Sequence, residues 1–355
     1  MRLFALCGAV AIVGSANAGV WNLNADWSDS ANPNGPWTLM KNPTAPFTTV
    51  IPQWSPGFPQ PAWADQPVPL HDHVPAWYKR TPIDYFAIDV PNGVIAAHGA
   101  EVDRTGTNVT LVRWTSPITG TVKVLGDIWP ARHLGREMDW ALAVNGSVTS
   151  VGQFAATNSY SSANPMNFYE GSGGFGAVSV NVVPGTTIDL RVISVDQNVG
   201  DFLATRYCLS TGDPFVLLLD VALEDWVGPI DAEPVTVTIL RQDGVVVEER
   251  SIVLNSEGPS SMLACLEGEY RVCVKAGHWL RQCDNVMFAP DGSGMISLSL
   301  PNGDIDGSNV IDSDDFDILV ANFGGTSGPA DLDGSGGIDS DDFDILVKNF
   351  GLEGD

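Results

Sequence analysis

The chain has 355 residues, of which 44% are hydrophobic and 17% charged, and its formal net charge is −26. This length allows two or three domains with cores of their own. Such a strong negative charge argues against nucleic acid or an anionic membrane surface as a partner.

The N-terminus predicts export. Arg2 supplies a basic start, residues 3–13 form a short apolar run, and residues 16–18 form a small-residue cleavage site. We therefore expect residues 1–18 to be a secretory signal peptide. That run is too short to span a bilayer, and no later stretch is long enough. The mature protein is expected to be soluble and secreted, held at the cell surface, or periplasmic.

We expect residues 19–212 to form a first domain, an antiparallel β-sandwich of jelly-roll type. Its N-terminal segment is rich in Pro and Trp. Short runs in which apolar and polar residues alternate recur at residues 110–114, 121–125, 140–144, 177–183 and 187–193. This pattern, broken by turn signals, is typical of such a sandwich. Asn145–Gly146 stands where a tight hairpin turn is expected.

Tryptophan is concentrated in this first domain. Nine of the eleven lie at or before residue 140: Trp21, Trp27, Trp37, Trp54, Trp63, Trp77, Trp114, Trp129 and Trp140. Exposed Trp rings could stack on sugars and form a glycan-binding surface. We favour a structural role, in which the rings cover the sandwich and fix its long entry segment.

Residues 213–302 predict a second, smaller sandwich resembling an immunoglobulin domain. Residues 235–240 and 245–253 flank Asp243–Gly244 and predict a hairpin, and residues 270–274 and 295–300 predict further strands. Export leaves four cysteines, Cys208, Cys265, Cys273 and Cys283, in a compartment that permits disulfides. Three pairings are possible. A hairpin turning at residues 277–278 favours the pair Cys273–Cys283.

Residues 303–355 contain one pattern written twice, over residues 304–324 and again over residues 331–351. From residue 301 onward fourteen acidic residues face the single Lys348, so half of the net charge lies here. In each copy oxygen-bearing side chains occupy positions 1, 3, 5, 9 and 12. A hard cation such as Ca²⁺ needs this spacing, with a backbone carbonyl from position 7.

A short helix should follow each loop. Ser313 and Ser340 are expected as N-caps, and Gly324 and Gly351 as helix ends. Apolar residues at helical spacing form a stripe on each helix: Phe316, Leu319, Val320 and Phe323, and then Phe343, Leu346, Val347 and Phe350. We expect the stripes to face each other and bury four phenylalanines. Because neither helix is long enough to be stable alone, metal binding and folding should be coupled.

Ile318 and Ile345 occupy equivalent positions away from these stripes. Two interpretations are open. They could form an exposed docking pair, or they could fill a contact with the preceding sandwich.

The tandem repeat resembles a type I dockerin, a pair of calcium-binding loop–helix segments related to the EF-hand. The resemblance implies two calcium ions and a cohesin-like or other extracellular protein partner. The implied ligands are Asp304, Asp306, Ser308, the Val310 carbonyl, Asp312 and Asp315 in the first loop, and Asp331, Asp333, Ser335, the Gly337 carbonyl, Asp339 and Asp342 in the second.

The repeat departs from the dockerin pattern in three places. Position 5 is Ser instead of Asp or Asn, and Asn309 replaces the usual glycine at position 6. The partner-selecting positions 10 and 11 are Ser-Asp in both loops, which is more acidic than the familiar patterns. Ile311 and Ile338, at position 8, resemble the aliphatic residues that pair between loops.

Two weaker resemblances concern the sandwiches. Residues 19–210 are similar to carbohydrate-binding-like domains of exported bacterial proteins. Residues 214–300 are similar to carboxypeptidase-regulatory or fibronectin-like sandwiches. Both resemblances are patchy, but they imply an extracellular role.

No motif for catalysis is evident. There is no nucleophile elbow, zincin helix or Cys–His pair, and the glycine loop at residues 171–176 precedes a predicted strand, which does not suit phosphate binding. His71 and His73 lack a third metal ligand. Candidate carboxylates for glycoside hydrolysis are Glu101, Asp103, Glu137, Asp139 and Glu170.

The sequence thus predicts a mainly β, exported, non-catalytic calcium-binding protein that docks to an extracellular assembly or surface and is associated with polysaccharide breakdown. One alternative is a glycoside hydrolase with its active site in residues 19–210. The other is a structural cell-surface protein.

Overall fold

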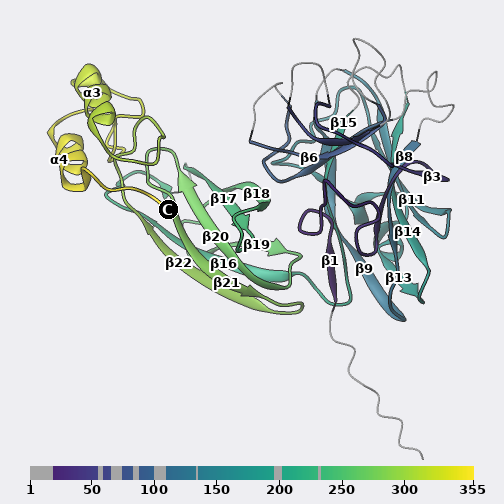
Figure 1. The fold of residues 1–355 in the computed structure, drawn as a ribbon. Helices are drawn as coiled ribbons and strands as arrows, with labels where there is room; N and C mark the ends of the chain where they lie inside the picture. Colours follow the sequence, from purple (N-terminus) through teal and green to yellow (C-terminus); the bar gives the residue numbers. More distant parts are fainter. Residues whose placement is uncertain are drawn as a thin grey trace, which may run out of the picture.

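The computed structural model describes residues 19–54, 59–64, 74–82, 88–99, 109–132, 135–195, 202–230 and 233–355. The expected signal peptide, the His71/His73 pair, Glu101 and Asp103 lie outside these ranges. The chain is mainly β, with several sheets and two short helices near the C-terminus (Figure 1). No helix among the described residues is long and apolar enough to cross a bilayer.

Two sheets form the first sandwich. In the described chain the larger sheet has the order β12-β9-β15-β7-β6-β5-β4, with β1 also paired to β15 and β13 to β9. Its strands are β1 (Val20–Asn22), β4 (Val50–Ile51), β5 (Ala62–Ala64), β6 (Ala76–Lys79), β7 (Ile95–His98), β9 (Gly120–Pro130), β12 (Met166–Asn167), β13 (Ser179–Val182) and β15 (Phe202–Ser210).

The facing sheet has the order β11-β10-β14-β8-β2-β3. Its strands are β2 (Trp37–Asn42), β3 (Ala45–Pro46), β8 (Val109–Thr115), β10 (Met138–Val144), β11 (Ser147–Phe154) and β14 (Thr187–Ser194). The predicted hairpin joins β10 to β11, where Asn145 and Gly146 both have positive φ, at 47° and 82°. That conformation is what a two-residue hairpin turn of this kind requires.

Tryptophans supply much of the core of this sandwich. Seven of the nine tryptophans named above are buried, and the remaining two, Trp21 and Trp27, are partly buried against the same core. Buried rings from both sheets, such as Trp77 and Trp140, belong to one apolar cluster. A tryptophan-lined glycan surface is therefore wrong, and the structural role is confirmed.

A connecting segment crosses one edge of the larger sheet. It contains a 3₁₀ turn, η1 (Phe168–Glu170), and one helical turn, α2 (Gly174–Ala177), before β13 begins. The expected strand at residues 177–183 is thus shorter than predicted. The glycine loop at residues 171–176 lies in this segment.

The second sandwich contains a three-stranded and a four-stranded sheet, in the orders β19-β16-β22 and β18-β17-β20-β21. Its strands are β16 (Phe215–Leu223), β17 (Pro234–Leu240), β18 (Val246–Val253), β19 (Ser260–Ala264), β20 (Gly268–Ala276), β21 (Gln282–Phe288) and β22 (Ser293–Leu300). The pair β16–β22 is parallel. Cys273 and Cys283 lie opposite each other on β20 and β21 and form the favoured disulfide.

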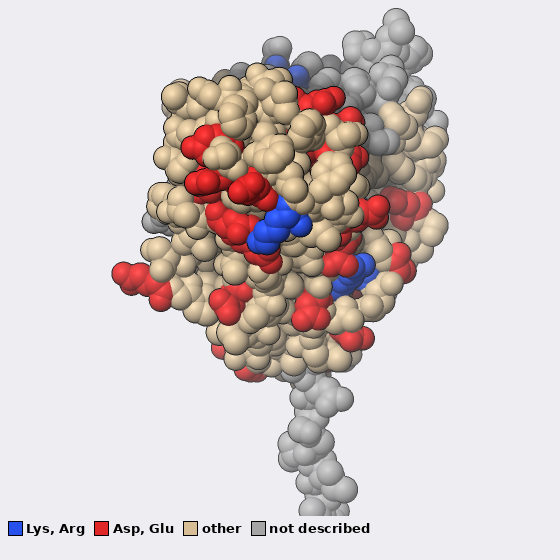
Figure 2. Space-filling view, turned by 90° about the vertical axis from the view of Figure 1, so that its left-hand side faces the viewer, with Lys and Arg blue, Asp and Glu red and all other residues tan. Residues whose placement is uncertain are grey.

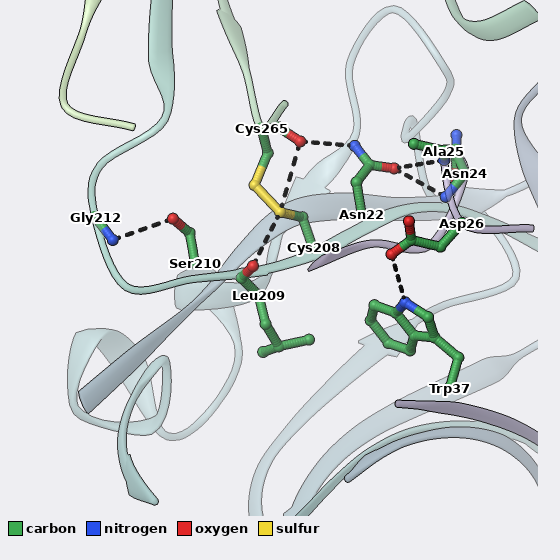
Figure 3. Close-up of a disulfide and its surroundings, with 10 residues drawn as sticks. All are labelled: Asn22, Asn24, Ala25, Asp26, Trp37, Cys208, Leu209, Ser210, Gly212 and Cys265. Carbon is green, nitrogen blue, oxygen red and sulfur yellow. Dashed lines mark hydrogen bonds between the residues drawn. A yellow bond between two sulfur atoms is a disulfide. The ribbon is translucent and has the colours of Figure 1, made fainter. Parts of the chain in front are cut away.

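A second disulfide joins the two sandwiches. Cys208 on β15 is bonded to Cys265, which follows β19 (Figure 3). Beside it, Asn22 of β1 donates from its side-chain amide to the carbonyl of Cys265 at 2.9 Å. A covalent bond and a hydrogen bond thus hold the two units at one point.

The helices α3 (Ser313–Asn322) and α4 (Ser340–Asn349) form the end of the molecule farthest from the first sandwich (Figure 1). Their apolar cluster includes Ile311, Leu319, Ile338 and Leu346, together with Leu280 from the second sandwich. The helical end therefore shares a core with the sandwich that precedes it.

Candidate metal centre

Two clusters of carboxylates lie in the loops that lead into α3 and α4. Asp304, Asp306 and Asp315 form the first, and Asp331, Asp333 and Asp342 form the second. Within each cluster, one oxygen of every carboxylate lies within 4.8 Å of the others. Each group could hold a metal ion, and both occupy the positions 1, 3 and 12 of the repeat.

The position-12 carboxylate organises each loop. In the first loop Asp315 accepts hydrogen bonds from the backbone N–H groups of Ile305 at 2.7 Å, Asp306 at 3.0 Å and Asp312 at 2.9 Å. Both carboxylate oxygens are used, so one buried side chain joins the start of the loop to its end.

The second loop repeats this arrangement. Asp342 accepts from the backbone of Leu332 at 2.6 Å, Asp333 at 3.2 Å and Asp339 at 2.8 Å. Equal bonding in two copies of the pattern shows that the geometry belongs to the repeat itself and not to its surroundings.

The position-1 carboxylates hold the middle of each loop. Asp304 accepts from the backbone of Asn309 at 3.1 Å, and Asp331 accepts from Gly336 at 3.1 Å. Both donors have left-handed backbones, with φ of 69° and 91°. Glycine adopts this conformation freely and Asn tolerates it, which explains why Asn309 can replace glycine at position 6.

Electrostatics differ among the carboxylates of the loops. Burial raises the pKa of Asp315 and of Asp331, whereas the backbone N–H of Ser308 lowers the pKa of Asp306. Burying carboxylates beside one another disfavours their charged forms. A bound cation would relieve that cost.

The donor set fits calcium. Oxygens bound to one Ca²⁺ at about 2.4 Å can lie no more than about 4.8 Å apart, and the oxygens of both clusters lie within that limit. All of the donors are carboxylate oxygens, which a hard cation prefers. Lys275 of β20 also reaches the first cluster, because its ammonium lies 2.7 Å from Asp304.

The remaining expected ligands have local partners. The Ser308 hydroxyl donates to the Val310 carbonyl at 3.1 Å, so these two expected ligand oxygens are neighbours. In the second loop the backbone N–H of Ser335 donates to Asp333 at 2.9 Å.

Asp312 and Asp339, at position 9, act as helix N-caps. Asp312 accepts from the backbone of Asp314 at 2.8 Å, and Asp339 accepts from Asp341 at 2.9 Å. The caps expected at Ser313 and Ser340 are therefore wrong by one residue. The reason is that the position-12 carboxylate bonds back to the position-9 backbone, which completes a capping box one residue earlier.

The expected burial of four phenylalanines is also wrong. Phe316 and Phe343 are 36% and 37% exposed, while Phe323 and Phe350 are 55% and 53% exposed. Turning Asp315 inward fixes the rotation of α3, and residues three and four positions later, Ile318 and Leu319, then face inward with it.

Ile345 is buried and Ile318 partly buried in the cluster that contains Leu280. The interpretation of these isoleucines as an exposed docking pair is therefore wrong, and they belong to the apolar cluster that the helices share with the preceding sandwich. Ile311 and Ile338 share this cluster. Each bonds through its backbone to the segment after the helix of the other repeat, since Ile311 accepts from Gly351 and Ile338 from Gly324.

Polar contacts fix this unit on the second sandwich. The backbone N–H of Val227 donates to the carbonyl of Asp333 at 2.8 Å, and Lys348 lies 2.8 Å from Asp225. At the C-terminus Asp355 pairs with Arg271 of β20 at 2.7 Å. Both loops are therefore held at the junction between the helices and the sandwich.

Two of the candidate catalytic carboxylates have local roles. Asp139 accepts from the side-chain amide of Gln153 at 3.4 Å, and Glu170 accepts from the backbone of Asn167 where η1 begins. Two other candidates, Glu101 and Asp103, lie outside the residues that the structure describes.

Comparison with known proteins gave partial likenesses. No family model matches this chain, and no curated protein sequence resembles it significantly. Similar solved structures include two interface mutants of a type II cohesin–X-dockerin complex from Acetivibrio cellulolyticus. Both cover 39% of this chain and 97% of the solved chain, at 22% and 20% identity and TM-scores of 0.33 and 0.32.

The adhesin domain of Epf from Streptococcus pyogenes is another such structure. It covers 77% of this chain and 96% of its own, at 12% identity and a TM-score of 0.20. TM-scores this low carry no argument about the overall fold or the activity of the present chain.

Proposed function

We propose that residues 303–355 form a dockerin-like module that binds two calcium ions and docks the chain to another extracellular protein. The observation that carries this proposal is the pair of matched carboxylate clusters. In each one, the position-12 aspartate accepts hydrogen bonds from the backbone N–H groups at positions 2, 3 and 9 of its own loop. Asp304, Asp306 and Asp315 would hold one ion, and Asp331, Asp333 and Asp342 the other. Ser308, Val310, Asp312 and their equivalents in the second loop would complete the two sites.

Calcium would supply charge neutralisation in these loops. Three carboxylates converge in each cluster, and Asp304, Asp315 and Asp342 are fully buried. The first cluster has one cation nearby, Lys275, and the second has no ion pair among the described residues. Metal binding should therefore stabilise the second loop at least as strongly as the first.

The docking surface would be the outer side of the two helices, which we call the outer strip. Its members are apolar and from 36% to 55% exposed, and the two copies of the repeat contribute equally: Phe316, Val320, Phe323, Phe343, Val347 and Phe350. The rings of Phe316 and Phe343 meet edge to face with centroids 6.2 Å apart, so the two halves form one continuous surface. An exposed apolar patch of this kind is typical of a protein-binding site.

The surroundings of the outer strip indicate the chemistry of the partner. Asp314, Asp317, Asp341 and Asp344 are exposed on the same two helices. On the side of the molecule where the helices lie, carboxylates gather around uncharged surface and outnumber Lys and Arg (Figure 2). The partner is therefore expected to present an apolar patch with a basic rim.

The wider role follows from the resemblance to dockerins. A docked, exported protein with two sandwiches would belong to an extracellular or cell-surface assembly, and an association with polysaccharide breakdown is part of that proposal. The Ser-Asp pairs at positions 10 and 11 make the surface more acidic than familiar dockerins, which favours a partner with matching positive charge.

Calcium titration of the full chain by calorimetry tests the metal sites. We expect two ions per chain, one ion after Asp315→Asn or Asp342→Asn, and two ions after Asp317→Asn. Asp317 is a matched control, because it is an exposed acid on α3 outside the cluster. Failure of the unmodified chain to bind calcium at millimolar concentration would refute the metal sites.

Docking is tested separately with the double variant Phe323→Ser/Phe350→Ser. Both side chains are more than half exposed, so the fold and calcium binding should be retained. Binding to immobilised cohesin domains and to surface proteins from the source organism should be lost. A partner that binds the double variant as tightly as the unmodified chain would exclude the outer strip as the docking surface.

A further inference from the structure

A cavity of about 460 Å³ lies where the first sandwich meets the second. Its walls come from β9 and β15 on one side, from β18 and the residues around Cys265 on the other, and from the η1–α2 segment at the rim. This volume is within the range of small-molecule sites, and junctions between domains are where such sites often occur.

The junction that forms the cavity is fixed in place. Figure 3 shows part of its wall, where the Cys208–Cys265 disulfide and the hydrogen bond from Asn22 tie the sandwiches together. Cys208, Cys265 and Asn22 all line the cavity. The two sandwiches that form the walls of the cavity are therefore held in a fixed relative position.

Four charged side chains line its inner part, and their charges balance. Arg206 contacts Asp127 at 3.1 Å and Glu248 at 3.3 Å, and Glu248 also pairs with Arg250. Asp127, Arg206 and Glu248 are 8%, 7% and 4% exposed. Buried charges that neutralise one another leave no net field to attract an ionic ligand, but they offer several hydrogen-bonding groups.

The guanidinium of Arg206 is held in place from several sides. Its Nε lies 3.3 Å from Glu248 and its Nη1 lies 3.1 Å from Asp127. One face of the guanidinium lies over the ring of Trp129, 4.7 Å from the ring centroid. The charged groups that line the cavity are therefore fixed in position.

The rim carries two aromatic rings. Tyr169 and Phe175 stack on each other, with ring centroids 4.7 Å apart and planes 9° from parallel. Phe175 is 74% exposed and Tyr169 is 41% exposed. In the described parts of the two sandwiches, no other Phe or Tyr ring is as exposed, because the rest are packed into the cores.

We propose that this cavity binds a short neutral oligosaccharide, with one sugar face against the Phe175 ring and hydroxyl groups toward the Asp127–Arg206–Glu248–Arg250 cluster. A sugar combines a flat C–H face with many hydroxyls, which matches an aromatic rim in front of charge-balanced donors and acceptors. A charged ligand would have to unbalance the buried ion pairs, and a wholly apolar one would leave them without new partners.

This site is independent of the proposed docking surface. It lies at the junction of the two sandwiches, while the outer strip lies on α3 and α4 at the end of the molecule (Figure 1). Loss of calcium binding would leave this proposal standing, and loss of sugar binding would leave the docking proposal standing.

Calorimetric titration of the full chain with neutral disaccharides and trisaccharides tests the proposal. The panel contains β-linked and α-linked glucans, xylans and mannans, with oligogalacturonate as the charged comparison. We expect at least one neutral sugar to bind saturably. Phe175→Ala should weaken that binding about tenfold, and Phe175→Tyr should retain it. Met287→Ala removes a side chain that is 65% exposed outside the cavity, and it should leave the binding unchanged.

Folding of Phe175→Ala is checked by its thermal midpoint, which should not move because the side chain is largely in solvent. Three results would overturn the proposal. They are no saturable binding of any neutral sugar, equal binding by Phe175→Ala, and preferential binding of the charged oligosaccharide.

Discussion

The substitution Asp315→Ala is the sharpest test of how the first loop is built. The carboxylate accepts three backbone hydrogen bonds, from Ile305, Asp306 and Asp312, at 2.7 to 3.0 Å. Bonds to a charged acceptor are each worth about 1.5 to 3 kcal/mol, and removing the acceptor leaves buried donors without partners. We therefore expect a local loss of at least about 4 kcal/mol, or about a thousandfold increase in the local opening constant.

Amide hydrogen exchange read by mass spectrometry measures this change directly. In chelator, Asp315→Ala should accelerate exchange in residues 304–312 about a thousandfold and affect residues 331–339 much less. Asp342→Ala should give the reverse pattern, because it occupies the equivalent position in the second loop. Asp317→Ala, on the exposed side of α3, should change neither segment.

Repeating the exchange with calcium separates the two roles of Asp315. In the unmodified chain calcium should protect both loops further, and in Asp315→Ala it should protect only the second. If residues 304–312 keep their protection in Asp315→Ala without calcium, then the carboxylate does not organise the loop, and the argument for a prepared site fails.

Three further results are expected. Burial lowers the pKa of Lys79 from 10.5 to about 8, so the folded state binds fewer protons than the unfolded state between these pH values. The free energy of unfolding should therefore rise by at most about 3 kcal/mol as the pH increases from 8 to 10.5. In urea titrations, Lys79→Met should show a smaller rise over the same pH range. Replacing Cys208 and Cys265 by Ser opens a loop with a sequence separation of 57 and should cost about 4 kcal/mol on a chain-entropy estimate; an unchanged urea midpoint would contradict it. Gly334→Val should loosen the helices from the sandwich, because Gly334 has φ +71° and an added Cβ would lie 2.4 Å from the Trp226 ring; unchanged exchange in residues 331–339 would refute this contact.

Features set by short-range sequence could be predicted. The hairpin at Asn145–Gly146 needs only two residues with positive φ between alternating strands, and both the turn and the strands are confirmed. The Cys273–Cys283 pair follows from the hairpin of β20 and β21, which places the two cysteines opposite each other. In the repeat, the spacing of Asp304, Asp306 and Asp315 was enough to predict that they converge, while their role as metal ligands stays a prediction.

Features set by long-range packing could not. The Cys208–Cys265 bond depends on how the two sandwiches meet, and the parallel pairing of β16 with β22 joins segments more than seventy residues apart. No local pattern reports either one. The cavity between the sandwiches depends on the same contact, so Arg206 and Glu248 gave no signal as a pair before the fold was known.

The helices show why an apolar stripe alone can mislead. Periodicity identified two faces on each helix but could not decide which one turns inward. The choice is made by Asp315 and Asp342, whose loop hydrogen bonds fix the rotation and carry Leu319 and Leu346 into the core. The carboxylate in the first turn thus decides which face of each helix turns inward, and the four phenylalanines remain between 36% and 55% exposed.

This rotation connects the two halves of the proposed function. The same aspartates that would hold calcium also determine that the outer strip faces away from the sandwich, because loop geometry and helix rotation are set by one group of hydrogen bonds. Losing the ion should therefore disturb the outer strip even though no member of it belongs to either carboxylate cluster. Calcium would act on docking through the orientation of α3 and α4, and a partner that bound equally well in calcium and in chelator would separate the metal sites from the docking surface.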